Sequence, residues 1–443
     1  MRALFDGGCS LSLLAVCLLT VAGCETEASF VAGEGLEASN DDVAATPRGD
    51  GGRTASSDWP KWRGPLADGI ARNNKWRKNW DEQPPTVAWK TNVGIGFGSM
   101  AVVDGRLYVM GHNGEKDEGR GEETVYCLDA ATGEEVWKHS YPGPLLDKQH
   151  EGGPGATPTV VGKRVFTHGR DSQLYCLDAA TGERLWSKML KEEFDVEQPT
   201  WAFSCSPLPL GDGVILDIGR VVALDQATGK TLWATGKFQA GYGTPAAFKG
   251  PDGPRLAVLN NDYLIVLEAK DGSEIARTAW ETQYDTNATT PIVESDRIYI
   301  STGYNKGCLL ARLEDGKLEW VYDNKEMRNH MANCVLIDGY LYGVDGNSHS
   351  SRNCNLVCQN FETGDAMWKE RGYGCGTVLA ADGMLIVLSD EGRLVLAPVD
   401  PKRFEPIAEV RVLTGKCWTV PVLAGGRIYC RNATGDMVCL DVR

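Results

Sequence analysis

Histidine is scarce in this sequence, and the motifs that many hydrolases and nucleotide-binding enzymes depend on are missing. The 443 residues include six histidines, with no His-Glu-x-x-His and no phosphate loop or Gly-x-Ser-x-Gly in a strand–turn–helix context. The first motif holds zinc, and the others cradle a phosphate or present a nucleophilic serine. Their absence argues against zinc proteases, P-loop enzymes and α/β-hydrolases.

Positive charge is also in short supply. Lys and Arg number 45 against 60 Asp and Glu, which gives a formal net charge of -15 and a pI of about 5.0. Nucleic-acid binding needs a positive surface, so no nucleic-acid partner is expected. The acidity is typical of a well-solvated protein surface.

Long apolar runs are missing except for one near the start. The run from Leu11 to Ala22 has the length of a signal-peptide core and is too short for a comfortable membrane span. It leads into Val-Ala-Gly-Cys, ending at Cys24, which resembles the bacterial lipobox. We therefore expect residues 1–23 to be a signal peptide and Cys24 to carry a lipid. The alternative is an ordinary signal peptide with a chance cysteine.

Export places the mature chain in the bacterial cell envelope, facing the periplasm or the exterior. Lipidation would add attachment to a membrane, and the sequence leaves inner and outer membrane open. Residues 24–57 lack apolar periodicity and are rich in Gly, Ala, Ser, Asp and Glu. Such a segment cannot bury enough apolar surface to fold, so we expect a disordered, lipid-anchored linker.

An internal repeat dominates the rest of the chain. VYCLDAATGEEVW ends at Trp137, LYCLDAATGERLW at Trp186 and VVALDQATGKTLW at Trp233, and more worn copies end near residue 276, at Trp320 and at Trp368. In each copy, alternating apolar residues predict a strand, Asp-x-x-Thr-Gly a turn, and the residues up to the Trp a second strand. The turn glycines stand at 133, 182, 229, 272, 316 and 364, so successive spacings are 49, 47, 43, 44 and 48 residues.

A second strand pair precedes each hairpin, as in VVDGRLYVMG, so each repeat has four strands. Four strands at this period are typical of propeller blades. Six repeats are complete, and a seventh lies at about 374–413. Residues 417–443 supply three strands of an eighth blade, and the segment PTVAWKTNV, with Trp89, would supply its fourth. The sequence therefore predicts an all-β, eight-bladed propeller of four-stranded antiparallel blades over residues 84–443. Pairing of the N-terminal strand with the C-terminal blade would close it.

Fourteen cysteines in an exported chain raise the question of disulfides. Cys127, Cys176, Cys358 and Cys439 occupy equivalent positions on separate blades, too far apart to bridge. We expect them to be small buried apolar residues. There is no Cys-x-x-Cys-His, so covalent haem is not expected.

These repeats resemble those of the quinoprotein, or pyrroloquinoline-quinone-like, β-propeller family, whose hallmark is Leu-Tyr-x-Leu-Asp-x-x-Thr-Gly-x-x-x-Trp. The segment Trp-Pro-x-Trp-Arg-Gly-Pro at 59–65 resembles the opening of a bacterial subgroup, and we expect residues 58–83 to form a strap packed on the propeller. The family has a catalytic branch of alcohol and sugar dehydrogenases. Its non-catalytic branch includes the lipoprotein that assists outer-membrane β-barrel assembly.

The resemblance implies two alternative functions. Members of the catalytic alcohol dehydrogenase branch carry an adjacent Cys-Cys pair against the quinone and place acid and amide ligands on calcium. This chain has no adjacent cysteines, and Asp217, Asp285, Asp345 and Asp390 are scattered at expected strand ends or turn caps, whereas calcium needs about six to eight oxygen ligands. We therefore expect a non-catalytic binding or scaffold module without cofactor or metal. The alternative is an alcohol dehydrogenase-like oxidoreductase that uses pyrroloquinoline quinone and calcium.

The candidate site is one mouth of the central channel, where loops lead into the inner strand of each blade. Loops tolerate change while the blades hold them, and aromatic side chains with polar tips are common in binding hot spots. We expect an envelope protein or a small molecule to bind there, with Trp201, Tyr242, His330, Tyr373 and Trp418 as main contacts. The alternative is that these rings only plug the channel. The residues just before the inner strands that form this candidate site are Phe97, Trp201, Phe203, Tyr242, Asn287, His330, Tyr373 and Trp418.

Overall fold

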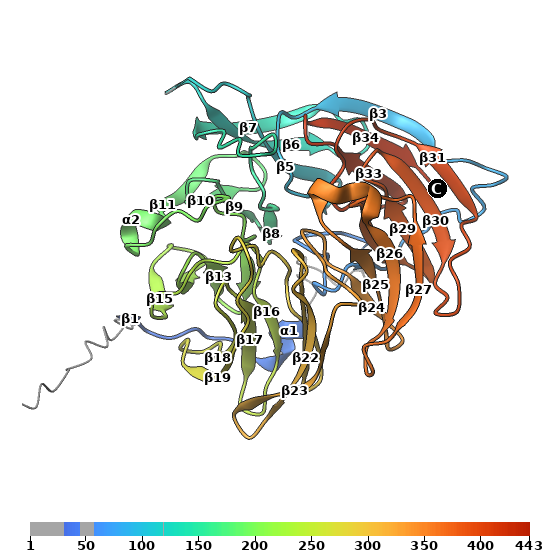
Figure 1. Ribbon diagram of the computed structural model, residues 1–443. Helices are drawn as coiled ribbons and strands as arrows, with labels where there is room; N and C mark the ends of the chain where they lie inside the picture. Colours follow the sequence, from blue (N-terminus) through green and yellow to red (C-terminus); the bar gives the residue numbers. More distant parts are fainter. Residues whose placement is uncertain (1–30, 45–56, 118) are drawn as a thin grey trace, which may run out of the picture.

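The computed structural model describes residues 31–44, 57–117 and 119–443. In these residues, eight separate sheets are arranged around a central channel (Figure 1). Four antiparallel strands form each blade, and two of the sheets gain a fifth strand from the N-terminal part of the chain. The predicted all-β, eight-bladed propeller is confirmed. No helix among the described residues is long and apolar enough to cross a membrane.

The first four blades follow one another along the chain, and each runs from the channel outwards. Their strands are β4 (Ala101–Val103), β5 (Arg106–His112), β6 (Glu122–Asp129) and β7 (Glu135–Pro142); β8 (Thr159–Val161), β9 (Arg164–His168), β10 (Gln173–Asp178) and β11 (Arg184–Met189); β12 (Leu208–Leu210), β13 (Gly213–Asp217), β14 (Val221–Asp225) and β15 (Thr231–Ala234); and β16 (Ala246–Lys249), β17 (Pro254–Leu259), β18 (Tyr263–Glu268) and β19 (Glu274–Ala279). A short helix, α2 (Leu190–Glu193), follows β11.

The last four blades repeat this order. Their strands are β20 (Ile292–Glu294), β21 (Arg297–Thr302), β22 (Gly307–Glu314) and β23 (Lys317–Asn324); β24 (Val335–Ile337), β25 (Tyr340–Asp345), β26 (Asn355–Asn360) and β27 (Ala366–Arg371); β28 (Thr377–Ala381), β29 (Met384–Leu388), β30 (Arg393–Pro398) and β31 (Ala408–Arg411); and β32 (Val422–Ala424), β33 (Arg427–Arg431), β34 (Asp436–Asp441) and β3 (Thr86–Asn92). A 3-10 helix, η1 (Ser348–Asn353), joins β25 to β26.

The eighth blade closes the ring with strands from both ends of the chain. β3 pairs antiparallel with β34, and Trp89 lies opposite Cys439. Figure 1 shows β3, coloured blue, beside the red β34. The predicted closure is confirmed: β3 is the outermost strand of the last blade and covers the edge of β34 that would otherwise be unpaired.

At four of the eight boundaries between blades, a Trp packs on the turn glycine of the next blade. A Cβ at Gly182 would lie 2.5 Å from the ring of Trp137, whose Nε1 donates to the carbonyl of Ala179 at 3.1 Å. Gly182 also has a φ of 75°, which favours glycine. The Thr-Gly turn is therefore both a hairpin turn and a packing surface. The same contact joins Trp89 to Gly133, Trp186 to Gly229 and Trp233 to Gly272.

The fifth blade departs from this pattern. The expected blade Trp, Trp320, is 48% exposed and packs on Trp280 of the fourth blade. Its place is taken by Tyr322, which contacts Gly364 and donates its hydroxyl to the carbonyl of Phe361 at 2.9 Å. Reading Trp320 as the blade Trp was therefore wrong, because the shorter turn of this hairpin moves the bulge and the register by two residues.

The cysteines at equivalent blade positions behave as the repeat predicts. Cys127, Cys176, Cys358 and Cys439 are free and buried. Burial raises the pKa of the Cys127 thiol to about 11. These thiols pack with aliphatic neighbours and are not exposed nucleophiles.

Part of the expected linker lies against the propeller. β1 (Val31–Ala32) pairs with β15, and the Nδ2 atom of Asn40, at the start of α1 (Asn40–Ala44), donates to the carbonyl of Gly250 at 2.8 Å. Residues 31–44 thus contact the third and fourth blades. The predicted signal peptide and the lipidation site Cys24 lie outside the described residues.

The strap crosses one end of the channel. Trp59 exchanges backbone hydrogen bonds with Val102 of β4, and the carbonyl of Pro60 accepts from Val160 of β8 at 2.8 Å. Further along, β2 (Ile70–Ala71) pairs in parallel with β28. The strap therefore contacts the inner strands of the first, second and seventh blades.

Candidate functional site

A cavity of about 360 Å³ lies at the channel mouth from which the inner strands start. Its wall comes from the segments that precede the inner strands of seven of the blades, which places it on the propeller axis. Representative lining residues, in chain order, are Phe97, Gly155, Ser204, Tyr242, Thr286, Ala332 and Trp418.

Five of the eight predicted site residues line this cavity. They are Phe97, Trp201, Tyr242, His330 and Trp418. They come from the first, third, fourth, sixth and eighth blades, so the repeat period had placed them at one level. The structure thus brings together four of the five expected main contacts.

Phe203, Asn287 and Tyr373 do not line the cavity. Phe203 is 2% exposed and packs beside the ring of His168 in the core. The Nδ2 of Asn287 donates to the carbonyls of Asn260 and Trp280, which fixes it between two blades. Tyr373 turns outwards, where its hydroxyl donates to Glu409 at 3.2 Å.

Aromatic rings form one corner of the cavity. Phe97 stacks on Trp418 with ring centroids 5.5 Å apart, and His150 meets the edge of Phe97 at 5.3 Å. The ring of His150 also lies 6.2 Å from that of Trp201. His150 comes from the long connection between β7 and β8, so this loop supplies a wall of the corner.

Two cationic side chains border the same corner. The ammonium of Lys416 lies 4.4 Å from the ring centroid of Trp418 and 2.8 Å from the carboxylate of Glu151. Arg170, in the turn between β9 and β10, is 3% exposed, and burial lowers its pKa to about 10. Its side chain makes one hydrogen bond within the described chain, from Nη2 to the carbonyl of Leu146 at 3.1 Å.

Two histidines of the cavity, His150 and His330, are neutral near pH 7 and present N–H donors. Burial, with the charges of Arg170 and Lys416, lowers the pKa of His150 to about 4, and burial does the same for His330. The Nδ1 atoms of His150 and His330 accept backbone hydrogen bonds from Gly152 and Ser348. In each neutral ring the proton is therefore on Nε2.

A second aromatic group forms the opposite side. Tyr304 meets the edge of His330 at 4.8 Å and stacks on His349 at 5.5 Å between centroids. His349 lies in η1, and Tyr304 lies in the turn between β21 and β22. Three of the six histidines, His150, His330 and His349, thus line this one cavity.

The strap forms the floor. Trp62 lines the cavity, and its Nε1 donates to the hydroxyl of Thr290 at 3.0 Å. Next to it, Arg63 is buried and its guanidinium donates to the carbonyls of Ala67, Asp68 and Cys334 at 2.9–3.1 Å. The mouth is therefore the wide end of the channel, and the strap occupies the other.

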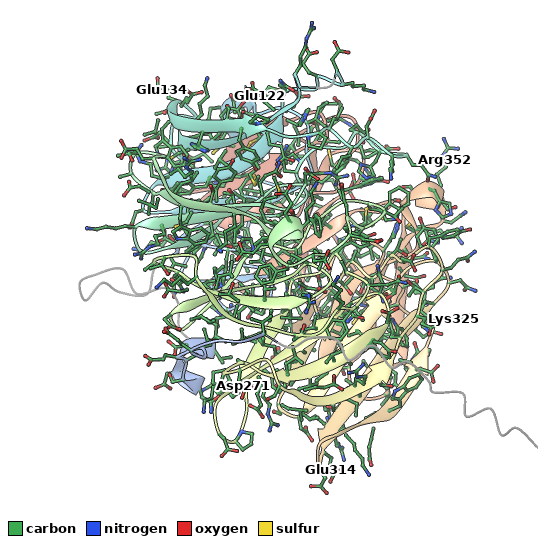
Figure 2. The ribbon with its side chains drawn as sticks, turned by 90° about the vertical axis from the view of Figure 1, so that its left-hand side faces the viewer. Glu122, Glu134, Asp271, Glu314, Lys325 and Arg352 are labelled. Carbon is green, nitrogen blue, oxygen red and sulfur yellow. The ribbon has the colours of Figure 1, made fainter. Side chains whose placement is uncertain are left out.

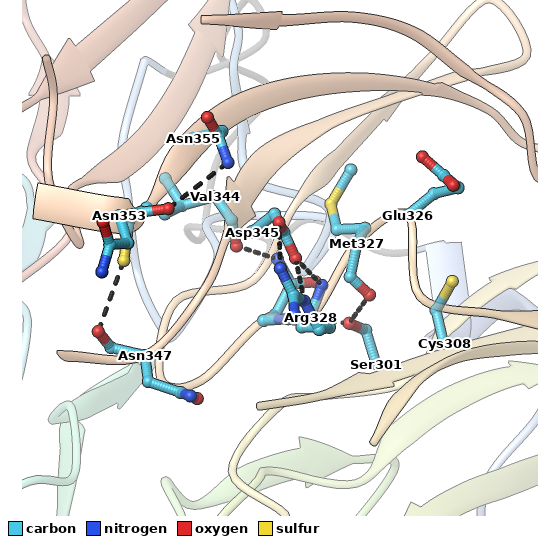
Figure 3. A network of polar contacts seen from close by, with 12 residues as sticks. Ser301, Cys308, Glu326, Met327, Arg328, Val344, Asp345, Asn347, Asn353 and Asn355 are labelled. Atoms are coloured by element: carbon cyan, nitrogen blue, oxygen red, sulfur yellow. Dashed lines mark hydrogen bonds and ion pairs between the residues drawn. The ribbon is translucent and has the colours of Figure 1, made fainter. Parts of the chain in front are cut away.

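The residues at the mouth do not fit a calcium-bound cofactor. No Asp or Glu lines the cavity, and nowhere in the described residues do three or more His, Cys, Asp or Glu gather as metal ligands. The carboxylate of Asp345 instead accepts two hydrogen bonds from Arg328, from Nε to Oδ1 at 2.6 Å and from Nη2 to Oδ2 at 2.7 Å (Figure 3). Calcium needs several oxygen ligands, and the cavity wall offers no carboxylate for it.

Several lining residues escaped the sequence analysis. Arg170 and Tyr304 lie in turns between the second and third strands of a blade, a level that the comparison of inner-strand loops does not sample. His150 and Lys416 lie in connections between blades. In three blades these turns contribute to the cavity wall, so aligning them as well would have pointed to Arg170 and Tyr304.

Comparisons with known proteins agree with this architecture. The family described as outer membrane protein assembly factor BamB matches residues 41–216 and 217–336. No curated protein sequence matches the chain. BamB from Moraxella catarrhalis is similar in structure, at 16% identity and a TM-score of 0.56, over 81% of this chain and 97% of that one.

Dehydrogenase structures are similar as well. A europium-containing methanol dehydrogenase shares 12% identity at a TM-score of 0.65, over 88% of this chain and 91% of that one. The quinohemoprotein alcohol dehydrogenase from Comamonas testosteroni shares 12% sequence identity at a TM-score of 0.66, over 91% of this chain and 82% of that one. At such identities these likenesses show the fold alone.

Proposed function

This chain belongs to the family of the outer membrane protein assembly factor BamB, and on that premise we propose that it is a non-catalytic binding module of the bacterial envelope. The observation that carries the proposal is the aromatic-lined cavity at the channel mouth, of about 360 Å³. Small-molecule sites typically enclose about 300–1,000 Å³ and combine apolar walls with a few placed polar groups. The cavity therefore suits one small organic molecule.

The family and the predicted lipobox support the envelope location. Lipidation of Cys24 is part of the proposal, as is the membrane attachment that follows from it. A Cys24→Ala variant should move from the membrane to the soluble envelope fraction. An unchanged distribution in cell fractionation would contradict the lipid anchor and leave the cavity proposal standing.

A protein partner is the second candidate for the same mouth. Tyr284 is 58% exposed and its ring lies 5.0 Å from that of Tyr304, so an exposed aromatic stands beside the cavity wall. Exposed aromatics with polar tips are favoured at protein interfaces. The family description, an assembly factor, also favours this candidate. Photo-crosslinking from position 284 in envelope extracts would identify such a partner.

The experiment for the main proposal measures small-molecule capture. Indole-3-acetamide and indole-3-acetate serve as probes, because a bicyclic ring can stack on Phe97 and Trp418. Calorimetry should detect binding of at least one probe to the full-length protein. Trp418→Ala should weaken it at least about tenfold, as expected for a central aromatic contact, with the melting temperature nearly unchanged. If neither probe binds, the proposal is overturned.

The oxidoreductase alternative has a direct assay. The fold of the dehydrogenases supports it, and the absence of carboxylates from the cavity wall speaks against its calcium requirement. We expect no reduction of an artificial acceptor after addition of pyrroloquinoline quinone, calcium and a primary alcohol. Alcohol-dependent turnover would overturn the non-catalytic assignment.

A further inference from the structure

We infer that the cavity selects a small aromatic carboxylate, without a metal, through a donor-rich corner made by Arg170, Trp201, His150 and Lys416. The inference rests on the proposed function and adds the chemical class of the ligand. It depends on three features of the corner: its free donors, its uncompensated charge and its stacking walls.

The corner holds donors whose hydrogen-bonding capacity is unused. The Nε of Arg170 and the Nε1 of Trp201 are buried without a partner within the described chain. An unpartnered Nε alone is not informative, because Arg431 has one too, but Arg431 donates three hydrogen bonds to carbonyls and Arg170 donates one. Buried donors without partners are costly. The guanidinium of Arg170 lines the cavity, so an incoming oxygen ligand would supply it with hydrogen bonds that the described chain does not.

The positive charge of the corner is only partly neutralised. Lys416 pairs with Glu151. Glu123 lies behind Arg170, where its Oε1 accepts from the backbone N–H of Arg170 at 3.1 Å and its Oε2 from the hydroxyl of Tyr141 at 2.8 Å. Burial raises the pKa of Glu123 to about 7, so near neutral pH this carboxyl is only partly ionised. An anion in the cavity would complete the neutralisation.

The contrast with the outer surface is sharp. The chain has an excess of acidic residues, and exposed carboxylates such as Glu122, Glu134, Asp271 and Glu314 stand at the periphery (Figure 2). None of the residues that line the cavity is acidic. A site that excludes carboxylates while presenting guanidinium, ammonium and N–H groups favours a carboxylate on the ligand.

The rest of the corner suits a flat ring. Phe97 and Trp418 form a stacked pair on one side, and Tyr242 lines another, with its hydroxyl accepting from the backbone N–H of Trp201 at 3.3 Å. Aromatic faces pack well against planar rings. A carboxylate at Arg170 therefore leaves the aromatic body of the ligand between these walls.

The test compares a carboxylate with its neutral isostere. Indole-3-acetate should bind the full-length protein at least about tenfold more tightly than indole-3-acetamide at pH 7, because hydrogen bonds to charged groups are the stronger ones. Arg170→Gln should abolish this preference and leave the amide bound as before. Trp201→Phe, which removes one N–H and keeps a ring, should reduce the preference by a few fold.

A matched control separates the corner from general charge. Arg352 lies in η1, is exposed and does not line the cavity (Figure 2). Arg352→Gln changes the net charge by the same amount as Arg170→Gln and should leave the preference intact. An equal loss in both variants would contradict a specific carboxylate corner.

The remaining outcomes distinguish this inference from the proposed function. Equal binding of acid and amide to the wild-type protein overturns the carboxylate inference and leaves the binding module standing. Binding of neither probe overturns both. If Arg170→Gln unfolds, Arg170→Lys is the second variant, because it keeps the positive charge and loses the paired N–H donors of the guanidinium. It should lower the preference for the acid over the amide while the circular dichroism spectrum stays unchanged.

Discussion

Two buried arginines, one at each end of the same channel, are held in opposite ways. Arg63, in the strap, is 6% exposed and donates to the carbonyls of Ala67, Asp68 and Cys334. Arg170, at the mouth, is 3% exposed and makes a single side-chain hydrogen bond within the described chain.

The difference separates structure from recognition. A buried guanidinium whose three nitrogens all donate to carbonyls, as in Arg63, fastens two segments together. A buried guanidinium with spare donors, facing a cavity, is stabilised further by a ligand. This contrast supports the proposal that the mouth binds a ligand while the strap end of the channel stabilises the fold.

The largest expected effect comes from breaking the strap end. Arg63→Met leaves the carbonyl of Cys334 and its neighbours without donors, and we expect a loss of about 3–5 kcal/mol in the free energy of unfolding. The matched variant Arg170→Met gives up one hydrogen bond and should cost less, about 1 kcal/mol. Denaturant unfolding of both variants measures the difference. Equal losses would mean that Arg170 is as structural as Arg63.

The next effect concerns the floor between the two ends. Trp62 is half-buried, so Trp62→Ala should cost roughly 2–3 kcal/mol, less than a fully buried Trp. The variant should also weaken the binding of indole-3-acetate and of indole-3-acetamide by the same factor, because Trp62 would contact the indole ring and not the carboxylate. Calorimetry of both probes checks this. If the variant weakened the binding of indole-3-acetate alone, the carboxylate would lie at the strap and not at the mouth, which would contradict the comparison.

A smaller effect depends on pH. Burial holds the pKa of His330 at about 4, below the unfolded value of about 6.5. The unfolded chain therefore takes up this proton first, and the stability present above pH 6.5 is lost as the pH falls towards 4. His330→Asn keeps an acceptor for Ser348 and should reduce the loss between pH 7 and 5 by roughly 1–2 kcal/mol.

The His330 comparison is made between the variant and the wild type because other groups act in the opposite direction. Glu123 and Asp217 have pKa values raised to about 7 by burial, so their protonation stabilises the fold over the same range. Both carboxyls are present in each protein, and their contribution cancels. Identical pH profiles would show that His330 is not held neutral by the fold.

Most of the fold could be predicted from the sequence because each blade repeats the same short-range chemistry. The Thr-Gly turn, the blade Trp and the alternating strands are local signals, and Trp89 supplied the closing strand. Trp320 shows the limit. Its place in the repeat looked right, but one shorter hairpin shifted the register, and only the packing on Gly364 shows that Tyr322 takes its role.

The candidate site was predicted in part for a related reason. The repeat period fixes the level of a residue along the channel but not the direction of its side chain. Phe97 and Trp418 turn into the cavity, whereas Tyr373, at the same level, turns outwards to Glu409. The turn that holds Arg170 could be found by aligning the repeats, but its role depends on burial and on missing partners, which only the three-dimensional arrangement shows.

The most direct test of the account is the pKa of His150, measured by NMR with and without indole-3-acetate. The charges of Arg170 and Lys416, added to burial, hold this pKa at about 4. A carboxylate bound between those two cations would offset their charge, so the account predicts that the acid raises the pKa of His150 and that indole-3-acetamide leaves it lower. Saturating binding of the acid with an unchanged pKa of His150 would contradict the account, because the anion would then lie away from this corner.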